Sequence, residues 1–552
     1  MTWGRKVLLC LGVCSLFSAC TKAAPPQYAF RIQFKDKQGS PSLSNPLVFL
    51  SQRALDRRSV QSVSLDTTDQ PVVTSYINDV LSNTSGTFHS SSKWMNSCVV
   101  LLTDSSQILN IVSKPYVADI KYVGYFFSGL HKTSTNNEPL SGMKVTGSSA
   151  YYGGSYDQTN MVNGAYLHDR GYKGTGKLIA VIDEGFSGVN TIDVYNNLMT
   201  SGRLLDTRNF VYATSDVFSA YTHGTTCLST MAADKQGTYV GSAPAAQYAL
   251  YVTEYSMGDY PVEMDDMAAA IERADSLGAD IISTSLGYNL FSGTFPDLAV
   301  TDIDGKSTVA AKAVNMASTK GMLCVITAGN EGGNTWNYVL TPGDADSAMT
   351  VGSVSSSYTP ASSSGFGPNA AGRIKPDVCM QGDPAAVVNS SGSAAVAGGT
   401  SYATPQLAGW AACLWQSSPS SSATKIRDAI RRSAHRYTNP DNHIGYGVPD
   451  FYKAAQYLGI TEMPSPSNSN DWLIIAPNPI GKQLACIVKS DGAEKVQFVI
   501  TDAVGKQVYA TSVDVKAGEQ KLPLTTPVLA KGVYFLKAQT KSKLKTVQFI
   551  QQ

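Results

Sequence analysis

The sequence predicts an α/β protein whose central domain is a doubly wound, mostly parallel sheet, with a smaller α+β domain before it and a β-sandwich after it. Three observations predict this arrangement. Apolar runs alternate with helical patterns over residues 164–459, strand and helix patterns mix over residues 25–130, and short alternating strands fill residues 471–552. At ~150 residues per domain, the length of 552 residues leaves room for about three or four such units.

The composition narrows the class of protein. Charged residues make up only 15%, against a typical ~25%, and 43 Lys plus Arg balance 42 Asp plus Glu to a net charge of +1. With so small a net charge, the protein has no overall positive electrostatic field that would attract a polyanion. A general nucleic-acid binder is therefore disfavoured. The apolar share of 43%, without long charge runs, also argues against disorder.

The N-terminus has the layout of an export signal. Arg5 and Lys6 precede an apolar run over residues 7–17, which ends in small residues before Cys20. The run is too short to span a bilayer, and no other stretch predicts a transmembrane segment. We therefore expect residues 1–20 to be a signal peptide. A lipoprotein cleavage site is the alternative and would place lipid on Cys20.

The cysteines beyond this leader are widely spaced and lie mostly in apolar runs, where a thiol acts as a small hydrophobe. The chain has no C-x-x-C pair, so we expect no zinc site and can assign no disulfide. These residues are Cys98, Cys227, Cys324, Cys379, Cys413 and Cys486.

Residues 25–130 read as strand, helix, strand, strand, helix and strand. This is the order of a ferredoxin-like split β-α-β unit, and an unrelated α+β module is the alternative. The helices are expected at residues 72–81 and 108–112. A stretch rich in Ser, Thr, Asn and Gly then predicts a linker or processing segment over residues 131–163.

In the central domain, continuous apolar strands alternate with helical patterns. Such strands predict a parallel sheet that is buried on both faces, with its chemistry at the carboxyl ends of the strands. Helices are expected from His223, at residues 264–277 and 309–320, and after Gly399. A Pro- and Ser-rich linker at 460–470 leads into the C-terminal strands, whose Gly and Pro turns predict a small β-sandwich.

Three short segments supply an acid, a base and a nucleophile in the order Asp, His, Ser. Asp183 ends the strand LIAVI, His223 opens a helical run, and Ser401 precedes a helix. Singly, each could be a turn residue or a helix cap. Together they are the groups that activate a serine hydroxyl, because the imidazole takes its proton and the carboxylate orients the imidazole. Asn330, after the strand MLCVIT, adds an amide that can donate to an oxyanion.

The order of the motifs D-x-G, H-G-T, A-G-N and G-T-S-x-A-x-P resembles the subtilisin family of serine endopeptidases. The resemblance implies that Asp183 is the orienting acid, His223 the general base, Ser401 the nucleophile and Asn330 the oxyanion donor. It implies polypeptide substrates and an acyl-enzyme intermediate, with no cofactor required. The resemblance also allows bound calcium, as in other family members, but no cluster of acidic residues in the sequence has the pattern of a calcium-binding loop.

The resemblance also assigns residues to substrate binding. One segment should pair with the extended substrate as an added strand, and a second should line the pocket for the residue before the scissile bond. Glu331 at the rim of that pocket would favour Lys or Arg, and a glutamate that only solvates a loop is the alternative. The residues so assigned are Ser285, Leu286, Gly287, Gly329 and Glu331.

The helix that starts at His223 departs from the family pattern HGTHVAGTIAA. Thr226 replaces the second His, Cys227 the Val and Ser229 the Gly. A thiol near the site raises the hypothesis that mercurials inhibit the enzyme, and a packed substitute for Val is the alternative. The other histidines are expected to be structural: His89, His131, His168, His435 and His443.

The flanking domains take roles from the same resemblance. Subtilases commonly carry a ferredoxin-like propeptide, so residues 25–130 are expected to be an inhibitory prodomain rather than a retained binding module, with self-cleavage between residues 125 and 163. The motifs PNP and KGVYFLK resemble a sorting domain of the type IX secretion route, which implies contact with secretion machinery and a secreted or outer-surface protein. An ordinary accessory β-sandwich is the alternative.

The rival from another functional class is a catalytically silent surface adhesion or structural protein built on the same scaffold. It predicts a broken triad, whereas Asp183, His223 and Ser401 are all present in this sequence.

Overall fold

The computed structural model describes residues 27–126, 150–219, 221–255, 258–460, 472–475 and 484–551. The expected signal peptide with Cys20, the linker residues 131–149 and 461–470, His131 and the PNP motif lie outside the described residues. Within the described ranges, no helix is both long and apolar enough to span a bilayer.

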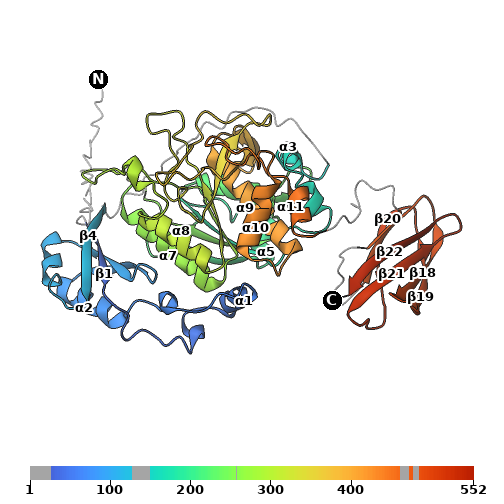
Figure 1. The fold of residues 1–552 in the computed structure, drawn as a ribbon, viewed down its shortest axis with the longest axis horizontal. Helices are drawn as coiled ribbons and strands as arrows, with labels where there is room; N and C mark the ends of the chain where they lie inside the picture. Colours follow the sequence, from blue (N-terminus) through green and yellow to red (C-terminus); the bar gives the residue numbers. More distant parts are fainter. Residues whose placement is uncertain are drawn as a thin grey trace, which may run out of the picture.

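The N-terminal domain is a four-stranded antiparallel sheet in the order β2-β3-β1-β4 (Figure 1). The first strand lies inside the sheet, which is the topology expected for a ferredoxin-like unit. Its elements are β1 (Gln27–Phe34), η1 (Pro46–Val48), α1 (Gln52–Val60), η2 (Thr67–Asp69), α2 (Thr74–Thr84), β2 (Thr87–Ser92), β3 (Ser97–Leu102), η3 (Ser105–Asn110) and β4 (Val117–Phe126).

Two helices in this domain differ from the sequence-based expectation. The helix expected at residues 108–112 is the 3-10 helix η3, which Asp104 caps by accepting from the Ser106 N–H. The helix α1 was not expected, because its sequence QRALDRRSV lacks an apolar stripe and buries Arg57 and Arg58 instead. Hydrophobic periodicity detects only faces that are covered by apolar side chains.

The central domain contains a seven-stranded parallel sheet in the order β13-β12-β11-β10-β5-β9-β6. The expected doubly wound parallel sheet is therefore confirmed. Its strands are β5 (Leu178–Asp183), β6 (Leu204–Asn209), β9 (Gln247–Val252), β10 (Ile281–Thr284), β11 (Leu323–Thr327), β12 (Met349–Val354) and β13 (Val378–Gln381). Two short hairpins add β7 (Asp234–Lys235) with β8 (Tyr239–Val240), and β14 (Ala385–Val388) with β15 (Ala394–Ala397).

Helices cover both faces of this sheet (Figure 1). Ile179 and Val181 of β5 join the apolar cluster of one face, and Ala180 and Ile182 that of the other. The first face carries α6 (His223–Ala232), α9 (Thr400–Ser417), α10 (Ala423–Ser433) and α11 (Phe451–Tyr457), and the second α7 (Val262–Leu277) and α8 (Val309–Thr319). The remaining helices are α3 (Tyr156–Met161), α4 (Ala165–His168), η4 (Asp193–Tyr195), α5 (Asn196–Thr200) and η5 (Val300–Asp302).

Residues 150–163, which were expected to belong to a linker, are folded against the central domain. Gln158 of α3 is buried, donates to the Tyr239 hydroxyl at 2.8 Å and accepts from the Ala386 N–H at 2.9 Å. The polar composition of this stretch therefore reflects side chains that hydrogen-bond to neighbouring segments.

The C-terminal region consists of two antiparallel sheets, β16-β17-β20 and β19-β18-β21-β22. Cys486 and Val488 of one sheet and Phe498 and Ile500 of the other belong to a single buried apolar cluster, as in a sandwich. The strands are β16 (Leu473–Ile475), β17 (Leu484–Ser490), β18 (Glu494–Asp502), β19 (Gln507–Val515), β20 (Gly518–Leu524), β21 (Gly532–Gln539) and β22 (Leu544–Gln551).

Candidate active site

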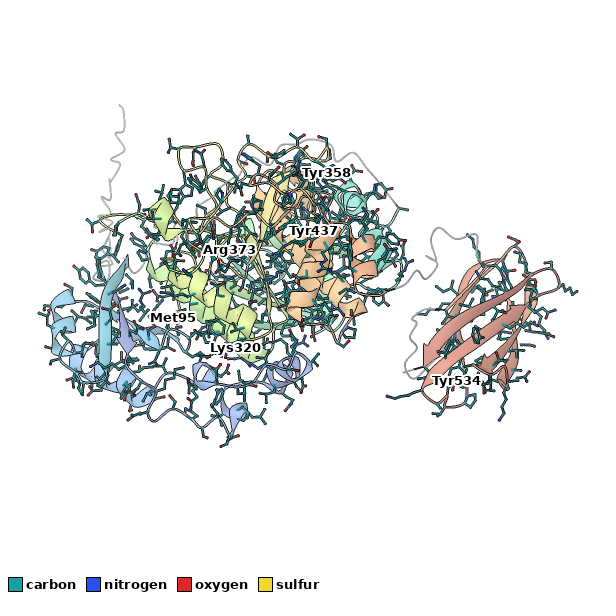
Figure 2. All side chains as sticks on the ribbon, viewed as in Figure 1. Met95, Lys320, Tyr358, Arg373, Tyr437 and Tyr534 are labelled. Carbon is teal, nitrogen blue, oxygen red and sulfur yellow. The ribbon has the colours of Figure 1, made fainter. Side chains whose placement is uncertain are left out.

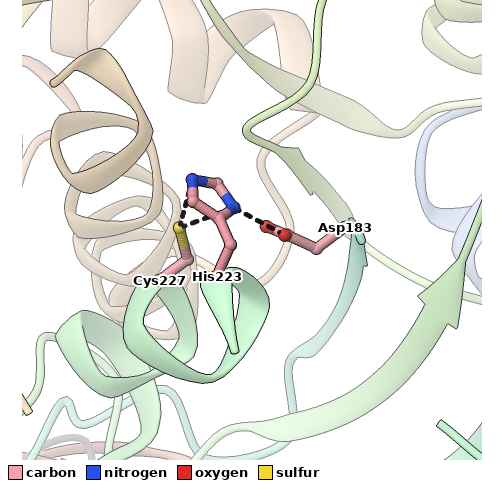
Figure 3. A group of neighbouring side chains, drawn as sticks. All are labelled: Asp183, His223 and Cys227. Carbon is pink, nitrogen blue, oxygen red and sulfur yellow. Dashed lines mark hydrogen bonds and ion pairs between the residues drawn. The ribbon is translucent and has the colours of Figure 1, made fainter. Parts of the chain in front are cut away.

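Asp183 and His223 form the centre of the site, at the carboxyl end of the parallel sheet (Figure 3). Asp183 is the last residue of β5 and His223 the first of α6, and the Oδ1 atom of Asp183 lies 2.7 Å from the Nδ1 atom of His223. The Asp183 side chain is 1% exposed and the imidazole 19%. The carboxylate also accepts from the Glu184 N–H at 2.8 Å, so it is held in one orientation.

The electrostatics of this pair stabilise the positive charge that the imidazole takes on once it accepts a proton. Burial by itself lowers the pKa of His223, but the Asp183 carboxylate outweighs it and raises that pKa well above its usual value. A proton that reaches the Nε2 atom is therefore stabilised where it arrives. This is the electrostatic requirement for a general base that must carry positive charge during a reaction.

Ser401 lies beside the pair, in the first turn of α9, and is 6% exposed. Its carbonyl oxygen accepts from the Sγ atom of Cys227 at 3.3 Å and from the Oγ atom of Ser285 at 2.9 Å. Within the described residues, its hydroxyl makes no hydrogen bond to His223. The structure thus brings Asp183 and His223 into direct contact and places Ser401 against the same turn of α6.

Cys227 fills the space between α6 and α9. Its Sγ atom is 3.8 Å from the Nδ1 and 3.9 Å from the Nε2 of His223 (Figure 3). Burial raises the pKa of this thiol, so it stays neutral. Asp183, His223 and Cys227 are also the one group of three potential metal ligands within 4.8 Å of one another in the described part of the chain. Since the carboxylate and the thiol both contact the imidazole, we interpret the group as the packed base of the site.

Asn330 is held by a chain of hydroxyl groups that sequence reasoning did not include. The Thr327 hydroxyl donates to that of Thr400 at 2.7 Å, and the Thr400 hydroxyl and N–H both donate to the Asn330 Oδ1 atom at 2.9 Å. Because Oδ1 accepts both bonds, the Nδ2 atom is left as the donor. Gly399 has a φ of +140° and passes so close that an added Cβ would lie 3.4 Å from the Asn330 amide.

The signal for these positioning residues was present in the sequence. Thr400 belongs to the G-T-S motif, and Thr327 is the last residue of a strand whose end was expected to carry chemistry. Only the tertiary structure shows that both threonines act on Asn330, because the end of β11 and the start of α9 meet there.

Glu331, expected at the rim of a substrate pocket, is engaged by its own loop. Its carboxylate accepts from the Asn334 side-chain amide, and its carbonyl oxygen accepts from the backbone N–H groups of Asn334 and Asn337 at 3.1 Å. These bonds favour the alternative in which Glu331 stabilises a loop.

The N-terminal domain packs against α7 through buried charges. Asp275 of α7 lies 2.6 Å from Arg57, 2.9 Å from Arg58 and 2.8 Å from the Nζ atom of Lys93. Burial alone would raise the pKa of Asp275, but these cations hold it well below its usual range. At the same boundary, Lys320 reaches Asp66 and Asp69 at 3.1 Å, and Met95 packs against the apolar cluster under α7 and α8 (Figure 2).

Histidine contributes to the same boundary. The Nε2 atom of His89 lies 2.9 Å from the Oδ1 atom of Asp266, and both side chains are at most 3% exposed. Glu272 accepts from the Ser92 hydroxyl at 2.5 Å and from the Lys93 N–H at 2.6 Å, and Arg31 donates to Asp265 at 3.0 Å. The N-terminal domain therefore supplies hydrogen-bond donors to four carboxylates of α7, with Arg or Lys cations at Asp265 and Asp275.

The fold and the Asp183–His223 pair, with a serine at the start of the adjoining helix, define the class of protein: a serine endopeptidase. The chain belongs to the subtilase family, whose model matches residues 174–447. Residues 29–138 match the peptidase S8 propeptide domain of Bacteroidota, and residues 474–552 match the secretion system C-terminal sorting domain. The family, the propeptide and the sorting domain predicted from the sequence are confirmed.

Curated relatives agree with this assignment. Subtilisin BL of Lederbergia lenta is 28% identical over 268 residues, which cover 48% of this chain and 86% of the relative. Alkaline elastase YaB of Bacillus sp. (strain YaB) is 29% identical over 291 residues, or 52% of this chain and 66% of the relative. The epidermin leader peptide processing serine protease of Staphylococcus aureus shares the fold, with a TM-score of 0.54 at 17% identity over 79% of this chain and 100% of that chain.

The sorting domain implies secretion or attachment at the cell surface. It gives no support to lipid on Cys20, which lies outside the described residues.

Proposed function

We propose that the chain is a secreted or cell-surface endopeptidase that hydrolyses peptide bonds through Asp183, His223 and Ser401. The observation that carries the proposal is the 2.7 Å contact between Asp183 and His223, on a helix that packs through Cys227 against the first turn of α9. Ser401 is in that turn, and the helix N-terminus favours the negative charge that develops there.

The residues would act in the usual order for a serine protease. The Ser401 hydroxyl attacks the scissile carbonyl while the His223 Nε2 atom takes its proton, and collapse of the tetrahedral intermediate expels the amine with that proton. Water then hydrolyses the acyl-enzyme by the same route. Asp183 holds the Nδ1–H tautomer and stabilises the imidazolium in both halves. Asn330 donates its Nδ2–H to the oxyanion, an interaction worth ~3 to 4 kcal/mol in subtilisin itself, the measured example.

Substrate binding would rest on the segments at the ends of β10 and β11. Ser285, Leu286 and Gly287 would pair with the extended peptide, and Gly329 would face the residue before the scissile bond. For Glu331, one comparison separates the two alternatives. Glu331→Gln should leave the ratio of cleavage after Lys to cleavage after Phe unchanged if the side chain serves its loop, whereas a fall in that ratio would support a pocket that selects basic residues.

The N-terminal domain would act as the inhibitory prodomain over residues 25–130, with self-cleavage between residues 125 and 163. The catalytic domain would span residues 164–459 and the sorting domain residues 471–552, which would engage the secretion machinery. The buried ion pairs on α7 support the first assignment, because they hold this domain against the protease. No residue is assigned here to a calcium ion, since the described part of the chain gathers no acidic cluster for one.

A fluorophosphonate probe tests the enzyme against its silent-scaffold rival. The purified full chain is allowed to mature and is then labelled, and the modified peptide and the new termini are mapped by mass spectrometry. Label on Ser401, absent from Ser401→Ala and present in Ser391→Ala, is the expected result; Ser391 is an exposed serine in the hairpin loop between β14 and β15. Matured protein without label on Ser401 would instead support a silent adhesion or structural protein.

A further inference from the structure

Leu340 occupies the space between two glycines that would flank the substrate. A Cβ built on Gly287 would lie 2.7 Å from the Leu340 Cβ, and one built on Gly329 would lie 2.6 Å from the Leu340 Cγ. Gly287 follows β10 and Gly329 follows β11, which are neighbouring strands of the sheet. The isobutyl group of Leu340 therefore touches both walls, and it is 7% exposed.

The backbone holds Leu340 in this position. Its N–H donates to the Ala328 carbonyl at 3.0 Å, which ties it to the wall that contains Gly329. The next residue, Thr341, exchanges two hydrogen bonds with Tyr288, of 2.8 and 3.3 Å, which tie it to the wall that contains Gly287. Leu340 is thus part of a segment bonded to both sides, and its backbone cannot withdraw without breaking those bonds.

The preceding residue has a different environment. Val339 is fully buried in a cluster with Ile303 and Ala328, and none of its atoms is among the three nearest to a Cβ built on Gly287 or Gly329. Two adjacent apolar residues therefore differ in what they touch, since Val339 packs in the interior and Leu340 packs between the expected substrate-binding segments. This difference provides a matched control within one segment.

We propose that Leu340 determines specificity by filling the pocket for the residue before the scissile bond, so that the pocket admits Gly, Ala or Ser and excludes larger side chains. The proposal rests on the proposed function, which places the substrate between Gly287 and Gly329. A Phe, Leu or Lys side chain would have to overlap the Leu340 isobutyl group, and close-packed groups resist such overlap. The exclusion is steric and applies to basic residues as well.

The test compares kcat/KM for peptides that differ only in this residue, with Ala, Leu, Phe or Lys. The parent should prefer Ala over Phe by about 10-fold or more, a usual size for discrimination by a pocket. Leu340→Ala should raise the Phe to Ala ratio by a similar factor, and Leu340→Val, which removes less volume, should raise it less. Val339→Ala should leave the ratio unchanged.

Several results would overturn the proposal. One is a parent that cleaves after Phe or Lys as well as after Ala; this readout needs no variant. Another is an unchanged Phe to Ala ratio in Leu340→Ala that retains fluorophosphonate labelling, and a third is an equal shift in Val339→Ala. If the parent itself is neither labelled nor active on any peptide, the proposed function has failed, which is distinct from a labelled enzyme without the expected preference.

Discussion

The helices on the two faces of the central sheet bury different kinds of side chain. The face with α6 and α9 holds the candidate catalytic groups, and α9 is buried from Thr400 to Trp415 among apolar neighbours. The face with α7 and α8 is also apolar against the sheet, but α7 buries carboxylates on the side that meets the N-terminal domain, which supplies their partners. These carboxylates are Asp265, Asp266, Glu272 and Asp275.

The difference follows from what each face must do. In the proposed mechanism Asp183 and His223 stay within hydrogen-bond distance through many turnovers, and close apolar packing holds backbone and side chains in one arrangement. Under the proposed function the propeptide leaves after self-cleavage, and a buried ion pair contributes little net stability because water solvates both ions again when they separate. The contacts inside the protease domain are therefore mainly apolar, whereas the contact with the N-terminal domain adds buried ion pairs to a small apolar patch around Val262.

Asp183→Asn tests the face of the sheet that carries α6 and α9, and it should have the largest effect. The amide cannot accept the Nδ1–H as the carboxylate does, so kcat should fall by about 10⁴-fold while the fold is kept. The measurement is kcat on a fixed peptide, with folding followed by circular dichroism. Asp193→Asn, which removes an exposed carboxylate that pairs with Lys235, should leave kcat unchanged. A loss of less than 10-fold in Asp183→Asn would contradict the role given to this residue.

Asp275→Asn tests the contact between α7 and the N-terminal domain. The neutral amide leaves Arg57, Arg58 and Lys93 without their shared anion, and breaking such a buried group costs ~3 to 5 kcal/mol. The propeptide should then dissociate at much lower salt after self-cleavage, as measured by size-exclusion chromatography of the matured full chain. Asp206→Asn disrupts the more exposed pair with Arg273 of the same helix and should change little. Equal dissociation in both variants would show that the buried charges do not hold the propeptide.

The same interface should weaken as the pH rises. Burial lowers the pKa of His89, but Asp266 outweighs it and the net shift is upward. Burial also raises the pKa of Asp265 to about 6. When a group has a higher pKa in the complex than in the separated domains, binding is strongest at a pH below the usual pKa of that group. Binding is then lost as the pH rises through the raised pKa. The propeptide should therefore be held at about pH 5 and released more readily above about pH 6.5.

Propeptide release measured against pH checks this expectation, with His89→Gln as the comparison. The glutamine can still donate to Asp266 but cannot titrate, so release should depend less on pH in the upper part of the range. The opposite dependence in the parent, with tighter binding at alkaline pH, would mean that other groups dominate.

Cys227→Val should have the smallest effect. The thiol is neutral, buried and packed between α6 and α9, so an apolar side chain of similar volume should cost less than ~1.5 kcal/mol and change kcat/KM by less than about threefold. A mercurial added to the parent and to Cys227→Val separates the two readings of this residue. Inhibition of the parent alone would show that the thiol senses mercury, and activity in both would leave it a packing residue.

The sequence was sufficient where local patterns carry the information. Asp183, His223 and Ser401 lie at strand and helix ends that could be predicted from apolar runs and motif order. The helix α1 could not, because Arg57 and Arg58 are buried only by virtue of Asp275, more than 200 residues away in the chain. From sequence alone, a charged residue is predicted to be solvent-exposed unless its oppositely charged partner is known.

By itself, the sequence determined the family, the order of the three domains and the candidate catalytic groups, since these depend on residue types in fixed local contexts. Only the tertiary structure decided that Thr327 and Thr400 orient Asn330, that the N-terminal domain supplies partners to the buried carboxylates of α7, and that Leu340 lies between Gly287 and Gly329. Each of these depends on segments that are distant in the chain and meet only when the sheet assembles, so no local pattern encodes them.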